Sequence, residues 1–559
     1  MRLNAQPKIL TVAILIPLLA IGGLQLTLVP IRHFDPDEFQ HLHSAWCISK
    51  GMLPYKDYFE HHTPFLHFVL APCFHFFNVE TDPDQAISFI FLARYCMWIF
   101  TAVMFWLTFT LGKRVKNPRV AWLGTLFLAT TPMFLAKCLE IRPDVLATLL
   151  WLACLLCVIR GMRSEGRGLR NFAWSGFFLG LGVMCTQKML FAIPGLAATM
   201  GWYLWRQKKC KNTKGQFWIL SSQIAGFCLP VLMILGYIAM RHGLSQFIEY
   251  NFIMNLTRRI RFAPYAHLSL LFSQSPLLVV FGIAGFLRTV SNLFRRESQG
   301  SHPGRESDVL LALNTLGLFA GLFLNPAPHR QSFLPLLPLM AILASISLVQ
   351  IAETAVELKG GASRKFRSLG FEGVAFVIFI LTQWWMDLSG YRPGVVQQGF
   401  YITMIGTPLL IGVVMISGRW KNWVVGIVLV ALCAHFSLQL KDMFQFRNKE
   451  TLSEIRYILV NSRPDETVMD GWTGLGVFRP HAWFFYFLHT EMRKMMTRDQ
   501  FDSLYQDLRT SRVAPRLILF DQDLKSLSPE ITAFFKQHYT SVGLPNIWVR
   551  KTEGDDDGS

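Results

Sequence analysis

Three carboxylates stand within four residues near the start of the chain, at Asp35, Asp37 and Glu38. They follow an apolar run at 9–29 that is long enough to cross a membrane. A carboxylate at a membrane surface can accept a proton from a hydroxyl or an amine, or can bind a divalent cation. The structural alternative is a helix N-cap, which needs only one such residue. Three carboxylates favour a chemical role.

A second acidic segment, Glu140 to Asp144, separates two later apolar runs. Arg142 could simply pair with Glu140 or Asp144, and Pro143 could simply start a helix, so structural and functional interpretations have equal weight here. Lys188 falls near the end of another apolar run. It either extends its amine to the membrane surface or binds a phosphate.

Two further polar segments share the same predicted side of the membrane. One contains Arg258, Arg259 and Arg261, which oppose the general charge bias described below and suggest an anion-binding role. The other is the proline-rich turn from Asn325 to Gln331, which is either a plain loop or part of a site.

Histidines are frequent between the first two apolar runs, at positions 33, 41, 43, 61, 62, 67 and 75. Their spacing matches no zinc motif, so hydrogen-bonding or titrating histidines are the favoured interpretation. Cys154 and Cys157 form a CxxC inside an apolar run, where two buried small residues are expected. The sequence also has no P-loop, GxGxxG or GxSxG motif, so nucleotide-driven chemistry is not indicated.

The elements that must position these residues are membrane helices. Of the 559 residues, 52% are hydrophobic and only 16% are charged, against about 25% charged in soluble proteins. Apolar runs of about 20 residues recur along the chain and predict about thirteen membrane spans. We therefore expect a mainly α-helical, polytopic membrane protein.

Charge bias predicts the orientation of these spans. One set of alternate loops holds 25 Lys and Arg residues and the other set holds 12. Basic residues are retained on the cytoplasmic side, so the N-terminus is expected inside and the C-terminus outside the plasma, or bacterial inner, membrane. The net charge of +18 reflects this asymmetry and argues against nucleic acid as a partner.

Two soluble segments are expected on the outward side. The loop at 31–85 contains an apolar stretch at 65–77 that is too short to span and predicts an interfacial helix. Residues 441–553 predict a small α/β domain without cysteines, with helices at 452–461 and 500–509 and strands at 516–520 and 547–549. The acidic tail at 554–559 is expected to be disordered.

The outward loop is similar to that of the GT-C membrane glycosyltransferases, the superfamily of protein O-mannosyltransferases, aminoarabinose transferases and related bacterial enzymes. The resemblance rests on Asp37-Glu38, then Gly51-Met52-Leu53-Pro54-Tyr55-Lys56-Asp57-Tyr58, then Glu60-His61-His62-Thr63-Pro64. It continues in Arg142-Pro143-Asp144, in Lys188 and in the prolines from Pro328 to Pro338. It covers about the first 345 residues, and His62-Thr63-Pro64 departs from the Lys-Pro-Pro of the aminoarabinose branch.

The resemblance implies transfer of a sugar from a polyprenyl-phosphate donor to a lipid, polysaccharide or protein acceptor, with no nucleotide. It implies a transmembrane catalytic core at 1–345, further transmembrane helices at 346–440 and an accessory outward domain. Asp37 would act on the acceptor nucleophile, and the acidic residues that would support it are Asp35, Glu38 and Asp144. The donor phosphate would meet Lys188, Arg258, Arg259, Arg261 and His62. Substrate contacts are expected from Tyr55, His329, Arg330 and Gln331, and whether a divalent cation participates is left open.

Two other functions compete with this one. A transporter or flippase would place ionisable residues near the middle of the membrane and would pair discontinuous helices between two halves. A non-catalytic scaffold would bind partners through its C-terminal domain, but would leave both acidic loops without a use. The outward position of the acidic residues favours surface chemistry over transport.

Overall fold

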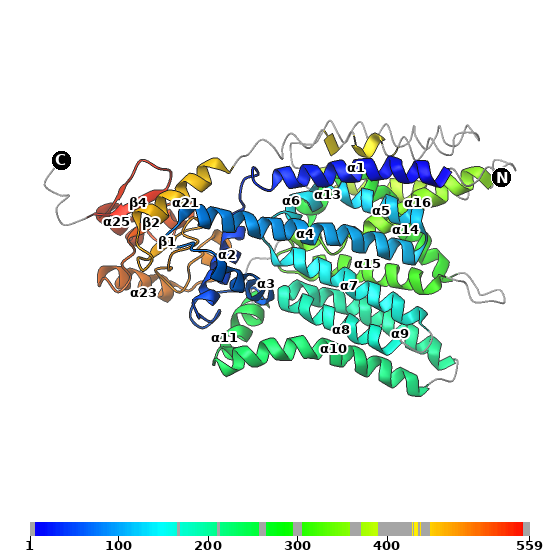
Figure 1. The fold of residues 1–559 in the computed structure, drawn as a ribbon, viewed down its shortest axis with the longest axis horizontal. Coiled ribbons are helices and arrows are strands. Elements are labelled where there is room, and N and C mark those ends of the chain that lie inside the picture. Colours follow the sequence, from blue (N-terminus) through cyan, green and yellow to red (C-terminus); the bar gives the residue numbers. More distant parts are fainter. Residues whose placement is uncertain are drawn as a thin grey trace.

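The computed structural model describes most of the chain, in the ranges 6–164, 168–209, 213–256, 264–294, 304–357, 370–388, 428, 430–433, 436–437 and 448–551. Long helices run side by side through one part of the molecule, and the first loop and the C-terminal region are gathered at the other end (Figure 1). The long helices are α1 (Gln6–Leu28), α4 (Pro83–Val115), α5 (Pro118–Ala129), α7 (Pro143–Arg163), α8 (Gly168–Cys185), α9 (Ile193–Lys209), α10 (Thr213–Met240), α14 (Pro276–Phe294), α15 (Arg305–Leu324), α16 (Leu337–Glu357) and α18 (Gly370–Leu388).

Within the described ranges, five of these helices are long and apolar enough to cross a membrane. A sixth span results if α5 and α6 (Pro132–Cys138), which meet at a bend of 70°, are counted together. The figure of about thirteen spans stays a prediction, since it includes segments outside the described residues.

Small residues let two of the helices approach closely. A Cβ atom added at Gly176 of α8 would lie 1.9 Å from the carbonyl oxygen of Gln223, and one added at Gly226 of α10 would lie 2.0 Å from that of Ala173. Neither contact is physically tolerable, so this helix pair depends on glycine at both positions. Close packing of this kind stabilises helix pairs where lipid removes the hydrophobic driving force.

Short helices cover the end of the bundle where the predicted site residues lie. Two follow α1 in the first loop, and the stretch expected to be an interfacial helix is present as α3 followed by a six-residue 3-10 helix. The short elements are α2 (Pro36–Ser49), α3 (Phe65–Leu70), η1 (Ala71–Phe76), η2 (Gln187–Ala192), α11 (Leu244–Ile248), η3 (Glu249–Ile253), α12 (Met254–Leu256), α13 (Tyr265–Gln274) and η4 (Arg330–Phe333).

The C-terminal region contains a four-stranded sheet in the order β1-β2-β4-β3, with β1 and β2 parallel and the other pairs antiparallel. Its strands are β1 (Val468–Asp470), β2 (Leu517–Leu519), β3 (Tyr539–Ser541) and β4 (Ile547–Arg550). Its helices are α21 (Lys449–Asn461), α22 (Thr490–Arg493), α23 (Arg498–Arg509), α24 (Gln522–Lys525) and α25 (Pro529–His538). Both predicted helices and both predicted strands are present, while β1 and β3 were not foreseen.

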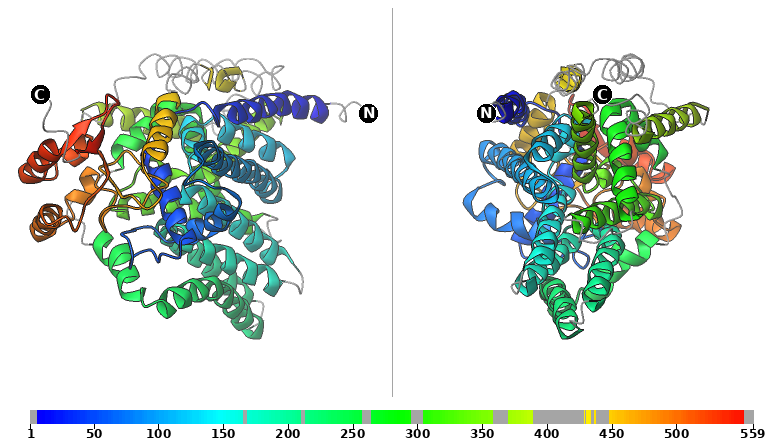
Figure 2. Two further views of the ribbon diagram at one scale, coloured as in Figure 1. Left: turned by 60° about the vertical axis from the view of Figure 1, so that its left-hand side comes forward. Right: turned by 90° about the vertical axis from the view of Figure 1, so that its right-hand side faces the viewer.

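This region packs directly on the first loop (Figure 2). The buried Arg479 donates to the carbonyl oxygen of Glu80 at 2.9 Å. Asn448 donates to the carbonyl oxygen of Pro30 at 2.6 Å. The backbone N–H of Phe59 donates to the carbonyl oxygen of Phe484 at 3.0 Å. The sheet is therefore fastened to the segments that carry the acidic cluster.

Candidate functional site

A cavity of about 590 Å³ opens where the first loop, the ends of several long helices and the C-terminal region meet. Seven of the residues predicted to act on the substrates line it: Asp35, Asp37, His62, Lys188, His329, Arg330 and Gln331. Asp144 borders a smaller adjoining pocket together with Lys188. The segment that contains Arg258, Arg259 and Arg261 lies outside the described residues.

The first turn of α2 separates the three neighbouring carboxylates into different roles. Asp35 is the N-cap and accepts from the backbone N–H of Asp37 at 3.2 Å, while Glu38 accepts from the backbone N–H of Asp35 at 3.0 Å. This reciprocal capping box shows that two of the three carboxylates, Asp35 and Glu38, stabilise the start of α2. Asp37 takes no part as an acceptor in the cap, and its carboxylate lines the cavity.

Glu38 points away from the cavity into protein. It is fully buried, and its two oxygens accept from Arg94 at 2.6 and 2.8 Å. Arg94 also donates to carbonyl oxygens of the segment that follows α1, including that of Arg32 at 2.8 Å. The geometry thus gives Glu38 a structural position rather than the catalytic one that the resemblance implied.

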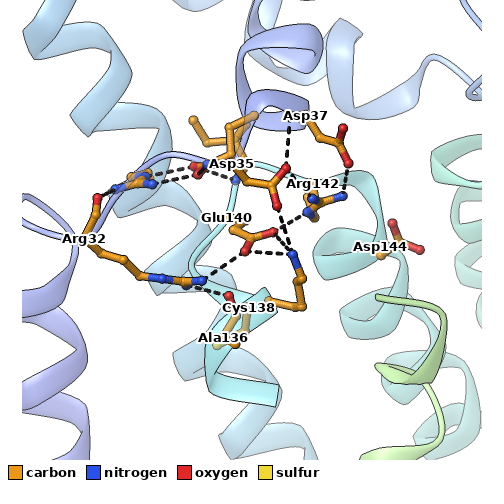
Figure 3. Close-up of polar contacts among 12 residues, drawn as sticks. Arg32, Asp35, Asp37, Ala136, Cys138, Glu140, Arg142 and Asp144 are labelled. Carbon is orange, nitrogen blue, oxygen red and sulfur yellow. Dashed lines mark hydrogen bonds and ion pairs between the residues drawn. The ribbon is translucent and has the colours of Figure 1, made fainter. Parts of the chain in front are cut away.

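Asp37 pairs with a buried arginine from another segment (Figure 3). Its Oδ2 accepts from Nη1 of Arg142 at 2.7 Å, and its side chain is 26% exposed toward the cavity. Burial raises the pKa of Asp37, but the Arg142 guanidinium outweighs this and holds the pKa well below its usual range. Asp37 is therefore an ionised acceptor at neutral pH.

Arg142 also joins Asp37 to a wider network of charges (Figure 3). Its Nη2 lies 2.9 Å from Asp35, its Nε contacts Glu140, and Lys137 lies 3.1 Å from Asp35 and 2.8 Å from Glu140. Burial raises the pKa of Glu140, yet Arg142, Lys137 and Arg32 together lower it to about 2. The structural alternative for the second acidic segment is realised, since Arg142 pairs with Glu140 and Pro143 begins α7. Its functional alternative stays a prediction.

Asp144 and Lys188 form a separate pair beside this network. The amine of Lys188 lies 3.1 Å from a carboxylate oxygen of the buried Asp144. The lysine side chain is 21% exposed and reaches the cavity from η2. One positive charge is thus held at the cavity wall by a carboxylate that is itself withdrawn from it.

His62 is oriented from beneath the cavity. Its Nδ1 lies 2.8 Å from the carboxylate of the fully buried Glu60, and its carbonyl oxygen accepts from the Tyr55 hydroxyl at 2.7 Å. Burial raises the pKa of Glu60, but the bond from His62 and the nearby histidines bring it well below its usual value. Tyr55 was expected to contact substrate. Instead it is fully buried against Phe247, so it holds the loop in place and does not reach the cavity.

The C-terminal region supplies one wall of the cavity through Trp472, His489 and Glu491. Glu491 lies 3.3 Å from Nε2 of His329, which belongs to the polar turn that lines the same cavity. This wall was not predicted from the sequence, because its residues are more than 400 positions from Asp37 and form no local motif. His329 and Arg330 were found because their turn was polar and faced outward.

Two carboxylates hold the turn that carries Trp472. Asp470 accepts from the N–H of Thr473 at 2.9 Å and from that of Gly474 at 2.6 Å, and Asp521 accepts from the N–H of Trp472 at 2.8 Å. Burial, with the charge of Asp521 second, raises the pKa of Asp470 to about 7. The folded protein is therefore more stable when Asp470 is protonated, even though the N–H donors of the turn by themselves favour the ionised carboxylate.

The stability of the protein should depend on pH through the protonation of Asp470. The folded protein binds the Asp470 proton more tightly than the unfolded chain, whose carboxyl keeps its ordinary pKa of 3.8. The stabilisation is thus complete below that value and is lost as the pH rises through about 7. We expect the wild-type melting temperature to fall between about pH 5 and about pH 8 by more than that of Asp470→Asn. Equal falls in the two proteins would contradict this assignment.

A divalent cation fits the acidic network poorly. Asp35, Asp37 and Glu140 are already matched by Arg142 and Lys137 within 3.1 Å, so a cation would have to displace these partners. Closely paired cationic side chains satisfy the same oxygens that a metal would need.

Comparisons with known proteins agree with the early resemblance. Residues 62–234 match the family model of the dolichyl-phosphate-mannose-protein mannosyltransferases. The structure of ArnT from Cupriavidus metallidurans bound to undecaprenyl phosphate is similar over 99% of both chains, at 12% identity and a TM-score of 0.57. The archaeal oligosaccharyltransferase AglB from Archaeoglobus fulgidus, in complex with an inhibitory peptide and a dolichol-phosphate, is similar over 96% of this chain and 74% of its own. That match has 10% identity and a TM-score of 0.52.

No curated protein matches the sequence. The structural matches nevertheless cover nearly the whole chain and agree with the family model over its shorter range. The chain is an integral membrane protein with the fold of the GT-C glycosyltransferases, the architecture that the motifs of the first loop predicted, and its residues 62–234 match a mannosyltransferase family model.

Proposed function

We propose that this protein is a membrane glycosyltransferase that moves a sugar from a polyprenyl-phosphate donor to an acceptor in the cell envelope, on the outer face of the membrane. The observation that carries the proposal is the cavity in which an ionised carboxylate, Asp37, faces the same space as Lys188, His62 and Arg330. A glycosyl transfer from a lipid phosphate uses a carboxylate that can take the proton of the acceptor and cationic groups that can bind the leaving phosphate. The ArnT and AglB structures hold undecaprenyl phosphate and dolichol-phosphate respectively, which supports the class of donor.

The reaction has a simple balance. A hydroxyl or amine of the acceptor forms a bond to the anomeric carbon, while the bond from that carbon to the phosphate oxygen breaks and releases polyprenyl phosphate. Asp37 orients the nucleophile by accepting its hydrogen bond and takes the proton as the new bond forms. Because Arg142 keeps the pKa of Asp37 low, Asp37 is a weak base that takes the proton only late in bond formation.

The leaving phosphate gains negative charge as the bond breaks. Lys188 is preset at the cavity wall by Asp144, and Arg330 lies on the far side of the same space. Cationic donors fixed where charge develops stabilise the transition state more than mobile water does. Arg258, Arg259 and Arg261 are proposed to extend this cationic surface, and His62 contributes one further donor in its protonated form.

Replacing Lys188 with Met tests the phosphate site. The charge-assisted hydrogen bond would be lost, so we expect polyprenyl phosphate to bind at least about 10-fold more weakly. Binding is measured as the rise in melting temperature of the purified protein when the lipid phosphate is added. Lys113→Met is the matched control, since Lys113 is exposed at the far end of α4. Equal lipid binding by the two variants would remove Lys188 from the phosphate site.

The activity itself is tested without assuming either substrate. Mass spectrometry of envelope lipids, polysaccharides and proteins is compared between cells with and without the gene. We expect one component to lose one glycosyl mass, which names the sugar and the acceptor together. Uptake of a labelled solute by the reconstituted protein, with no missing glycosyl mass, would replace this proposal with a transporter.

A further inference from the structure

Three side chains with metal-binding atoms meet between α2 and the C-terminal region: His43, Cys47 and His481. His43 and Cys47 are four residues apart and lie on one face of α2, and His481 comes from the segment after β1. Nε2 of His43 lies 3.0 Å from Nδ1 of His481 and 3.5 Å from Sγ of Cys47. None of the three is among the described residues that line the larger cavity.

These separations are close to those of a metal's coordination shell. Zinc bonds of about 2.0–2.1 Å to nitrogen and about 2.3 Å to sulfur, at tetrahedral angles, place two nitrogens about 3.3 Å apart and nitrogen and sulfur about 3.6 Å apart. The observed separations of 3.0 and 3.5 Å differ from these by only a few tenths of an ångström. A cation would fit with side-chain adjustments alone.

Two neighbouring side chains, Cys47 and His481, both lie within hydrogen-bond distance of one atom, Nε2 of His43. Nδ1 of His43 lies 2.9 Å from the carbonyl oxygen of Val477, which can only accept, so this nitrogen carries the proton. In the neutral ring Nε2 then has a single lone pair. Both Cys47 and His481 face that lone pair, and only one of them can donate to it well. A shared cation would give each of the three atoms its own bond.

The surroundings supply the other features of a metal site. The bond from His43 to the Val477 carbonyl fixes the tautomer and the ring orientation, which is the usual outer support of a metal-bound histidine. A cavity of about 20 Å³ adjoins His43 and His481 and has room for one water molecule. Cys47 is fully buried and His43 is 4% exposed, so bulk water would not compete strongly for the ion.

We propose that His43, Cys47 and His481 bind a zinc-like divalent cation, with one water molecule as the fourth ligand. The Cys47 thiol loses its proton to the solvent when its bond to the metal forms. The ion joins α2, whose first turn carries Asp37, to the segment that carries Trp472 and His489. It thereby fastens one wall of the larger cavity to the helix that presents the acidic cluster.

Protonation supports this ligand set in a second way. Burial lowers the pKa of His43 to about 4 and that of His481 to about 3, so both imidazoles are neutral and able to coordinate at neutral pH. Burial raises the pKa of Cys47 well above its ordinary value, so the thiol stays protonated until a cation replaces the proton.

The test uses the full-length protein in detergent, stripped with a chelator and then dialysed against Zn²⁺ or Co²⁺ alone. We expect one tightly held zinc ion per chain, and with Co²⁺ an absorption band from sulfur-to-metal charge transfer. Cys47→Ser should abolish that band and His481→Asn should weaken zinc binding at least about 10-fold. At one fixed zinc concentration, zinc should also raise the melting temperature of the wild type by more than that of either variant.

Cys73→Ser is the matched control, since Cys73 lies in the same outward loop and should leave the band intact. Failure of the wild type to retain zinc would overturn the proposal. Full zinc binding in both ligand variants would also overturn it. If that binding were lost when His61 is replaced, the ion would lie in the separate group Glu60, His61 and His62. The metal-free melting temperatures of the variants show whether either change has damaged the fold.

Discussion

Asp37→Asn is expected to lower the rate of sugar transfer by about 10²–10⁴-fold, the usual contribution of a positioned proton acceptor. Asparagine has the size of aspartate, but its amide cannot take the proton that the acceptor must lose. Arg142 keeps its bonds to Asp35 and Glu140 in this variant, so the network under the cavity is retained. The rate is measured in proteoliposomes with the donor and acceptor that the envelope comparison identifies.

Asp84→Asn provides the control for this variant. Asp84 also lies in the first turn of a helix, α4, but its side chain is 78% exposed and pairs with Arg456 on the surface. We expect its transfer rate to equal that of the wild type. Full activity of Asp37→Asn would mean that Asp37 does not act on the nucleophile, whatever the reaction proves to be.

The sequence predicted the parts of this site that are local. Asp35, Asp37 and Glu38 are conspicuous because they adjoin each other after an apolar run, and the same position also allowed for a helix N-cap. The reciprocal capping box between Asp35 and Glu38 was not predicted. The sequence could not predict that Asp35 caps α2, Asp37 faces the cavity and Glu38 is buried in the protein interior. This arrangement depends on Arg94 and Arg142, which lie 56 residues from Glu38 and 105 residues from Asp37.

Distance in sequence also concealed the contribution of the C-terminal region. Helices of ten or more residues, such as α21 and α23, show their amphipathic period clearly, whereas β1 and β3 have three residues each and show none. The spacing of the histidines in the first loop matches no zinc motif, yet the fold brings three possible metal ligands of that loop together, Glu60, His61 and His62. His43 and Cys47 meet their third partner, His481, only because the fold returns the chain to α2 after more than 430 residues.

The second large effect is expected on stability, from Arg94→Met. Arg94 is 2% exposed, and its guanidinium bonds to Glu38 and to the carbonyl oxygens of Val29, Arg32 and His33. Removing it leaves the Glu38 carboxylate buried without its cation, which costs about 3–5 kcal/mol. The melting temperature of the purified protein in detergent should therefore fall sharply.

Two comparisons separate this mechanism from a general loss of arginine. Arg456→Met breaks an exposed pair with Asp84 and should shift the melting temperature only slightly. Arg94→Met combined with Glu38→Gln removes both buried charges and should regain part of the loss, since the cost lies in the uncompensated carboxylate. Equal melting temperatures of Arg94→Met and Arg456→Met would mean that the buried Arg94–Glu38 pair does not hold α1, α2 and α4 together. The position of Asp37 in the first turn of α2 would then depend on other contacts.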